Sequence, residues 1–305
     1  MNDVASKALE LLGWLVWASL PLYVLVVYVL IKCRSQLKSS FFKLAISCGV
    51  ADISSVLCSL GFRVIPATIY HQIPASQSII GSTAYQTASN MFRAWGLYYT
   101  QAFGLVLLSI NRMTAIVMPL RYETIWVGYR LKLAIAGQWS FLAIFSVPML
   151  HPCCYAELDN VTMTSKFANP QTQNIFWTAA VGTEATVFLP TLIVTHVLML
   201  ASTVQGRKRE VNPAPRTSRG NSQQQSLLKS AEKNLALIGG ILCSLYLIMV
   251  TTWIYVSLFG TYFSPLHFQV AVGAGNLLAC VHPYLLLVFS SVFRSCFLST
   301  FSCKS

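Results

Sequence analysis

The sequence predicts an all-α membrane protein, a bundle of seven transmembrane helices. Only 10% of the 305 residues are charged and 55% are hydrophobic, whereas a soluble domain carries about 25% charged residues. Apolar segments long enough to cross a bilayer, about 20 residues each, recur along the chain. Basic residues gather in alternate connecting segments. The net charge of +12 therefore fits loops that face anionic lipid better than it fits nucleic-acid binding.

Seven segments have the required length and apolarity. The first has no charged residue, and we interpret it as a helix and signal anchor because it is too long for a cleavable leader. The sixth and seventh share sixty residues without Asp, Glu, Lys or Arg, which a turn at 259–265 divides. The predicted spans are approximately 11–31, 44–61, 94–110, 133–150, 175–201, 235–258 and 267–289, within one domain over residues 1–300.

The distribution of basic residues predicts an amino terminus outside the membrane. With that orientation, cytoplasmic segments hold 17 of the 21 Lys and Arg residues and outer segments hold three, as the positive-inside rule requires. Residues 205–233 form the longest inner segment, which is basic and rich in Gln, Ser and Pro and therefore predicts a flexible loop. Asn160 begins a sequon in an outer segment and is a glycosylation candidate.

Two carboxylates lie inside predicted spans, Asp52 in the second and Glu184 in the fifth. A charge at that depth is costly, so each is a functional candidate by default. Glu184, Arg93 and Tyr98 fall where a ligand would enter an outer cavity, and the plain alternative is packing inside a partly hydrated bundle. The sequence has no HExxH motif, CxxC spacing or paired acid motif, so we expect no enzyme, metal or cofactor.

The third predicted span ends in NRMTAIVMPLRYETIW, residues 111–126. This phrase resembles the inner end of the third helix and the second inner loop of rhodopsin-like G-protein-coupled receptors. The resemblance implies that Arg112 contacts the G protein or locks the inactive state, and that Pro119, Leu120 and Tyr122 lie at the G-protein interface. Asn111 stands in place of the usual acidic residue, so the usual ionic lock is not expected and basal activity could be higher.

Further positions agree with the same receptors in chain order. The resemblance implies a conformational switch that includes an intramembrane aspartate, two prolines and aromatic residues. It also implies a short amphipathic eighth helix and cytoplasmic tail over residues 290–305, where Cys296 and Cys303 are acylation candidates and plain thiols are the alternative. The switch residues are Asp52, Pro190, Trp253, His282, Pro283 and Tyr284.

Three departures from that pattern bear on the chemical class of the ligand and on the disulfide expected in such receptors. No lysine occurs between Lys233 and Lys304, and Asn276 stands where opsins carry the retinal lysine, so retinal is excluded and Asn276 becomes a ligand candidate. Ala94 stands where amine receptors carry an aspartate, so an amine ligand is not expected. The outer end of the third span has no cysteine, so the usual disulfide to the second outer loop is absent.

The nearest resemblance is to the nematode serpentine chemoreceptors of the Srg superfamily, class V or class gamma. The similarity is carried by three features: the asparagine before Arg112, the sequence YETIW at residues 122–126, and the sequence HPYLLLVFSSVFR at residues 282–294. The resemblance implies a chemosensory receptor in the plasma membrane of sensory neurons, within their cilia, that binds a small molecule and activates a heterotrimeric G protein. The alternative from another class is a small-solute transporter or channel, although the sequence shows no internal repeat.

Overall fold

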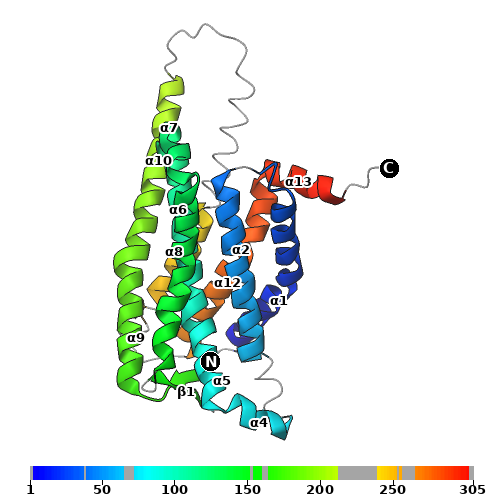
Figure 1. The fold of residues 1–305 in the computed structure, drawn as a ribbon, viewed down its shortest axis with the longest axis vertical. Helices are drawn as coiled ribbons and strands as arrows, with labels where there is room; N and C mark the ends of the chain where they lie inside the picture. The colour runs from blue at the N-terminus through cyan, green and yellow to red at the C-terminus, as the bar shows by residue number, and fades with distance from the viewer. Residues whose placement is uncertain are drawn as a thin grey trace.

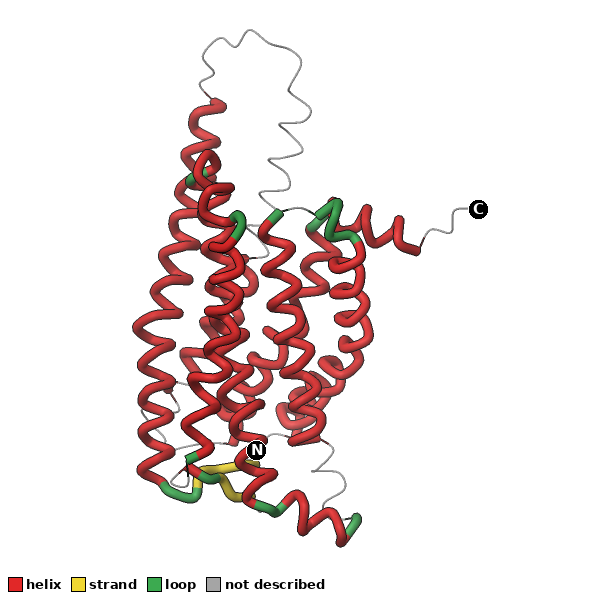
Figure 2. The backbone as a smooth tube through the Cα atoms, viewed as in Figure 1, coloured by secondary structure: helices red, strands yellow, loops and turns green. Residues whose placement is uncertain are grey.

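The structure is a computed structural model, and it describes residues 3–37, 39–64, 72–151, 154–159, 164–211, 239–252, 254–255 and 265–301. Nearly all of these residues are helical (Figure 2). The elements are α1 (Asp3–Lys32), α2 (Ser40–Ser59), η1 (Leu60–Val64), α4 (Pro74–Ile80), α5 (Thr83–Ser89), η2 (Asn90–Gly96), α6 (Leu97–Val117), α7 (Pro119–Trp126), α8 (Tyr129–Ser146), η3 (Val147–Leu150), β1 (Ala156–Asp159), β2 (Thr164–Phe167), α9 (Pro170–Thr183), η5 (Glu184–Phe188), α10 (Leu189–Val211), the helix Gly239–Thr252, α12 (Pro265–Phe289) and α13 (Ser291–Phe301).

A helix lies in each of the seven predicted ranges. Among the described residues, four helical runs are long and apolar enough to cross a membrane, and a fifth is added when the pair bent by 89° at Ser290 counts as one span. The third run starts at Thr83, before the predicted residue 94, and α10 continues to Val211, beyond the predicted residue 201. Seven spans and the outside amino terminus therefore stay predictions.

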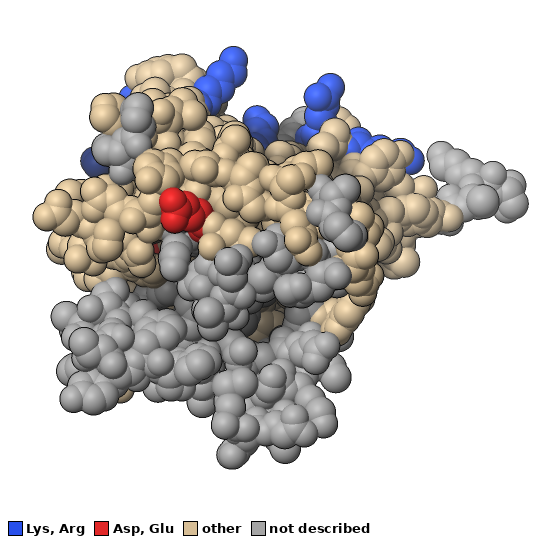
Figure 3. All heavy atoms as spheres, turned by 90° about the horizontal axis from the view of Figure 1, so that it is seen from below, with Lys and Arg blue, Asp and Glu red and all other residues tan. Residues whose placement is uncertain are grey.

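The helices form a bundle in which α6 is the central member (Figure 1). It contacts α2, α8 and α10, while α1 packs on α2 and α12. Figure 1 places α7, α13 and the C-terminal end of α10 at one end of the bundle, and α4 and the β-hairpin at the other. From the hairpin end, the atoms of described residues are mostly uncharged (Figure 3). We call the end with α7 and α13 the basic end, because it carries exposed basic residues. They are Arg34 after α1, Lys43 at the start of α2, Arg121 on α7 and Arg130 at the start of α8.

Small residues let α6 approach its neighbours closely. A Cβ at Gly104 would lie 2.6 Å from Gln138 Nε2 and 2.8 Å from Cys48 Sγ. Gln138 is fully buried on α8; it accepts from Ser47 Oγ at 2.8 Å and donates to the Thr100 carbonyl at 3.3 Å. Glycine at such contacts and polar side chains between helices are the usual means of packing membrane helices. The contacts of Gly104 and Gln138 therefore fix how α2, α6 and α8 are rotated relative to one another.

The side chains of Ser290 and Arg294 stabilise the sharp bend between α12 and α13. Ser290 Oγ accepts the Phe293 backbone N–H at 3.2 Å, which caps the start of α13. Arg294 donates to the carbonyls of Leu287 and Val288 at the end of α12. These two contacts satisfy backbone groups that a break in a helix leaves open, so α13 turns away from α12 within the predicted range 290–305.

The all-α prediction misses one small element. Residues 156–159 and 164–167 form an antiparallel two-stranded hairpin, β1 and β2, with Ala156 opposite Phe167. Both of these residues are buried, and the Phe167 ring lies 6.2 Å from the Trp95 ring and 5.1 Å from the Phe176 ring. The hairpin therefore covers the aromatic cluster at the end of the bundle opposite the basic end.

Candidate functional site

Arg112 lies in the last turns of α6, and its guanidinium stacks on an aromatic ring. The guanidinium carbon lies 3.2 Å from the centroid of the Phe41 ring at the start of α2. The buried Nε atom of Arg112 has no hydrogen-bond partner, and no carboxylate forms an ion pair with it, among the described residues. A cation over an aromatic face is stabilised by the ring's charge distribution. The ring therefore replaces the acidic partner that Asn111 cannot supply.

A small cavity lies beside Arg112. It has a volume of about 20 Å³ and is lined by Phe41, Leu108, Arg112, His282 and Leu242, among others. That volume is enough for about one water molecule. His282 is buried, and its Nε2 atom has no hydrogen-bond partner among the described residues. The cavity brings together α2, α6, the helix 239–252 and α12, with two polar side chains that have unused hydrogen-bonding groups.

Asn111 belongs to a hydrogen-bond network that joins three elements. It is fully buried, its Nδ2 donates to Ser40 Oγ at 3.0 Å, and its Oδ1 accepts from Tyr122 Oη at 3.3 Å. Ser40 Oγ and Tyr122 Oη lie 2.6 Å apart, and Ser39 Oγ is 3.3 Å from the same Tyr122 hydroxyl. We call Asn111, Ser40 and Tyr122 the polar triad. It connects the ends of α2 and α6 with α7.

Helix α7 is held by its C-terminal end and leaves its N-terminal end exposed. Trp126 is buried, and its Nε1 donates to Thr114 Oγ1 on α6 at 2.7 Å. Pro119 opens the helix, and the Leu120 side chain is 96% exposed. An apolar side chain so fully exposed at the basic end is available to a partner protein. Pro119, Leu120 and Tyr122 all lie on α7, with Leu120 at the surface and the Tyr122 hydroxyl in the polar triad, and their place at a G-protein interface stays a prediction.

Asp52 is buried in α2 and already has two hydrogen-bond donors. Tyr23 Oη from α1 donates to its Oδ2, and Gln101 Nε2 from α6 donates to its Oδ1 at 2.7 Å. The aspartate thus connects α1, α2 and α6 through hydrogen bonds that satisfy both oxygens. Carboxylates buried in membrane helices usually have partners of this kind.

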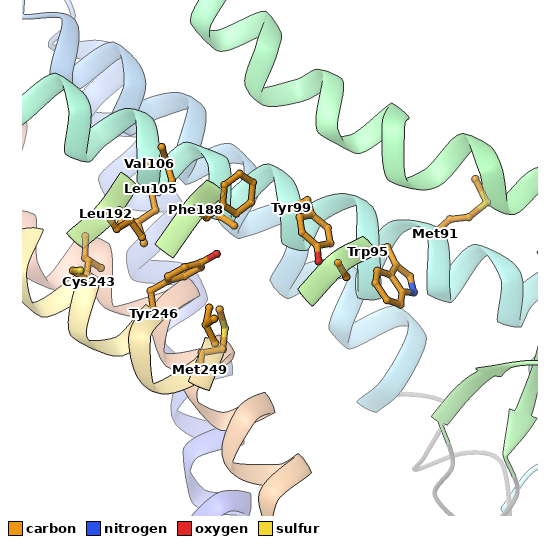
Figure 4. Packing of buried hydrophobic residues seen from close by; sticks show 14 of the residues in the cluster. Met91, Trp95, Tyr99, Leu105, Val106, Phe188, Leu192, Cys243, Tyr246 and Met249 are labelled. Carbon is orange, nitrogen blue, oxygen red and sulfur yellow. The ribbon is translucent and has the colours of Figure 1, made fainter. Parts of the chain in front are cut away.

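Glu184 lies in an aromatic cluster nearer the hairpin end. It is 3% exposed, and its carboxylate is close enough to the hydroxyls of Tyr98, Tyr99 and Tyr246 for its charge to act on each of them. The buried hydroxyls of Tyr98 and Tyr246 make no hydrogen bond of normal geometry among the described residues. In Figure 4 the Tyr246 hydroxyl points from its helix toward α6, on the side where Phe188 and Tyr99 lie.

Pro190 explains why Glu184 sits in a widened helical turn. A proline has no backbone N–H for the carbonyl four residues earlier, and its ring displaces that carbonyl. The turn before Pro190, Glu184–Phe188, is accordingly a π-helix, a form that is common at functional sites. Glu184 and Phe188 from this turn are both buried against the neighbouring helices. The predicted switch proline thus acts here by shaping the helix that carries Glu184.

The remaining predicted residues fall in three groups. Pro283 lies inside α12 and is buried, while the Tyr284 side chain is 40% exposed and points away from the cavity of His282. The Cys296 thiol is buried and contacts Gln36 Oε1 at 3.2 Å, so acylation would require it to leave that contact. Outside the described residues lie Trp253, Asn160 and Cys303, and the side chains of Arg93 and Asn276.

Several residues of these sites escaped sequence reasoning. Phe41 and Ser40 follow the first inner loop, far in sequence from Arg112 and Asn111, and nothing in their local pattern marks them. Gln101 and Tyr246 carried a usable signal, because polar groups inside apolar spans need partners. The carboxylates near them, Asp52 and Glu184, were recognised from their charge alone.

Comparison with known proteins identifies the family. "Serpentine receptor class V-1" of Caenorhabditis elegans is 29% identical over 136 residues, which are 43% of this chain and 41% of that receptor. The aligned region thus spans about two fifths of the relative's length. Neither match names the Srg superfamily, so that placement stays a prediction, whereas the resemblance to nematode serpentine receptors is confirmed. The family model described as serpentine type 7TM GPCR chemoreceptor Srv matches residues 13–303, and the chain therefore belongs to this family of multi-pass membrane receptors rather than to a family of enzymes.

Proposed function

We propose that this chain is a chemosensory receptor that binds a small-molecule cue and activates a heterotrimeric G protein through its basic end. In this proposal the chain crosses the membrane seven times, with the amino terminus outside and the basic end in the cytoplasm. Residues 205–233, whose first part continues α10 to Val211, form a cytoplasmic segment, and residues 290–305 form the eighth helix and tail. The family and the concentration of Arg and Lys at that end support the orientation.

The surroundings of Arg112 carry this proposal. The Arg112 guanidinium, stacked on Phe41 beside a cavity, has an Nε–H with no acceptor among the described residues. A cavity of about 20 Å³ cannot admit a peptide segment of another protein. The described arrangement is therefore closed, and coupling requires the helices around the cavity to separate.

A ligand drives such a change only if it binds the open arrangement more tightly than the closed one. In the proposed mechanism, the cue binds near Glu184 and Tyr98, with Arg93 and Asn276 as further ligand candidates. The inner ends of α10 and the helix 239–252 then move away from α6. This movement exposes Arg112 and frees α7, whose Leu120 lies at the surface, to contact the G protein.

The test measures G-protein activation in cells that express the tagged chain at the surface, against a panel of volatile and water-soluble small molecules. Arg112→Ala should abolish the response at a matched surface level. Lys43→Ala removes an exposed basic residue from the same end and should leave the response unchanged. Arg112→Lys keeps the charge but loses the planar stack on Phe41, so we expect a partial loss.

A response that survives in Arg112→Ala would contradict the assigned role of Arg112. Solute flux without G-protein activation would favour the transporter or channel alternative. The same cells report on two further proposals: glycosylation at Asn160, as a mass shift lost in Asn160→Gln, and delivery to the plasma membrane. Placement in sensory-neuron cilia is tested by imaging a tagged copy in the animal.

A further inference from the structure

Asp52 and Glu184 are the two buried carboxylates of the described helices, and the structure treats them differently. Asp52 accepts hydrogen bonds from Tyr23 and Gln101. Glu184 is at least as buried, but its polar neighbours among the described residues are the hydroxyls of Tyr98, Tyr99 and Tyr246, and those of Tyr98 and Tyr246 make no hydrogen bond of normal geometry. A buried carboxylate is costly unless charged or hydrogen-bonding groups compensate it. The difference marks Glu184 as the carboxylate whose neighbouring donors are not fully engaged, with no cation beside it among the described residues.

The sequence limits where a positive partner for Glu184 can come from. None of the seven predicted spans contains a Lys or Arg. Arg112 follows Tyr99 by thirteen residues on the same helical run, a rise of about 20 Å. Arg93, at the far end of that run, is the remaining basic residue of the third helix. The internal candidates for a cation at Glu184 are therefore basic residues at the hairpin end of the bundle, Arg93 among them, and the alternative is a cation from outside the chain.

The side chains around Glu184 suit an organic cation. The Tyr98 and Tyr99 rings meet edge to face at 5.1 Å, Tyr99 stacks on Phe145 at 3.8 Å, and Phe188 lies 6.2 Å from Tyr99. Tyr246, fully buried, faces them from the helix 239–252. Aromatic faces attract a desolvated ammonium group, and a carboxylate among them adds a charged hydrogen bond. Tyrosine hydroxyls without partners can accept further N–H groups.

We propose that Glu184, with the rings of Tyr98, Tyr99 and Tyr246, binds the ammonium group of a small amine. The proposal rests on the receptor function above and adds the chemical class of the cue. It also revises the expectation from Ala94: the carboxylate that meets the amine comes from the π-helical turn before α10, not from the helix that carries Ala94.

The test compares pairs of probes that differ in charge but not in size: 2-phenylethylamine with 2-phenylethanol, and hexylamine with hexanol. Binding to the purified full-length chain is read as a concentration-dependent rise in melting temperature. We expect each amine to bind at least about tenfold more tightly than its alcohol. Glu184→Gln should remove this preference, and Tyr246→Phe should weaken amine binding by a smaller factor. Glu157→Gln, at an exposed position of β1, should leave it unchanged.

Glu184→Asp keeps the negative charge and should keep a weaker preference for amines. This variant tests the proposal if Glu184→Gln does not fold. Equal binding of amines and alcohols, no binding of either, or an amine preference that survives in Glu184→Gln would overturn the proposal. The proposal would also fail if Glu184→Gln and Arg93→Gln lowered the melting temperature equally and amines bound no better than alcohols. Arg93 would then be the ionic partner of Glu184 within the chain.

G-protein activation in cells separates this inference from the receptor function. Amine binding without activation by any cue would leave the ligand class standing and remove the receptor function. Activation by alcohols, with no effect of amines, would support the receptor function and overturn the proposed ligand class.

Discussion

Replacing Tyr122 with phenylalanine should raise G-protein activation in the absence of any cue. The Tyr122 hydroxyl lies 2.6 Å from Ser40 Oγ and 3.3 Å from Asn111 Oδ1, and it is the part of the polar triad that reaches α7. Phenylalanine keeps the ring and removes only these contacts. The arrangement that they stabilise is closed, with a cavity of about 20 Å³ beside Arg112. The open arrangement should therefore gain population.

The magnitude follows from the two contacts. Hydrogen bonds between membrane helices average about 0.6 kcal/mol and reach about 1.7 kcal/mol. One short bond and one long bond, together with the buried Asn111 oxygen left without a donor, give about 1–2 kcal/mol. This corresponds to about a 5–30-fold change in a two-state equilibrium. A resting open population of about 1% would rise to about 5–23%.

The assay is nucleotide exchange on a G protein in membranes that carry equal amounts of surface receptor. Tyr129→Phe is the matched control, because the Tyr129 side chain is 72% exposed and its hydroxyl is not part of the polar triad, while phenylalanine keeps the ring that lies beside Arg130. Adding Arg112→Ala to Tyr122→Phe should return activation to the background. Basal activation in Tyr122→Phe that is equal to or below that of the Tyr129 control would refute the assignment of the polar triad to the closed arrangement.

Three other predictions concern packing, the buried aspartate and the tail. Gly104→Val should destabilise the bundle by about 1–3 kcal/mol, because the added atoms meet buried Gln138, and the melting temperature in detergent measures the loss. Tyr23→Phe should lower that temperature by several degrees, since a hydrogen bond to a charged group contributes about 1.5–3 kcal/mol; Asp52→Asn should then cost less in the Tyr23→Phe background than alone. Cys296→Ser should leave incorporation of a palmitate analogue unchanged, because the thiol is buried and contacts Gln36, just after the end of α1.

Each of these predictions has a matched comparison. Gly182→Val introduces the same side chain where nothing lies within 4 Å, so an equal loss of stability would contradict the packing argument. Additive effects of the Tyr23 and Asp52 changes would mean that the two residues do not interact. For acylation, Cys303→Ser should remove the label, and a label that depends on Cys296 instead would show that the thiol leaves its site.

The sequence was sufficient for features that depend on one segment at a time. Apolar length predicts where helices lie, because a helix that crosses lipid must satisfy its own backbone. Charge marked Asp52 and Glu184 as costly, and the phrase after Arg112 located the end of α6. Pro190 removes a backbone donor wherever it stands, so a distorted turn before it was predictable in principle. The hairpin was missed because its strands are short and stabilised by the aromatic cluster that they cover.

Only the tertiary structure decided which of these residues meet. Arg112 lies over Phe41 and Asn111 bonds to Ser40, although about seventy residues separate each pair. Glu184 lies near Tyr246 because η5 and the helix 239–252 both pack against α6. Hydropathy is nearly uniform around a membrane helix, so it does not determine how the helix is rotated about its axis. That rotation is set by close packing at residues such as Gly104 and by polar contacts such as those of Gln138, which exist only once the helices have come together.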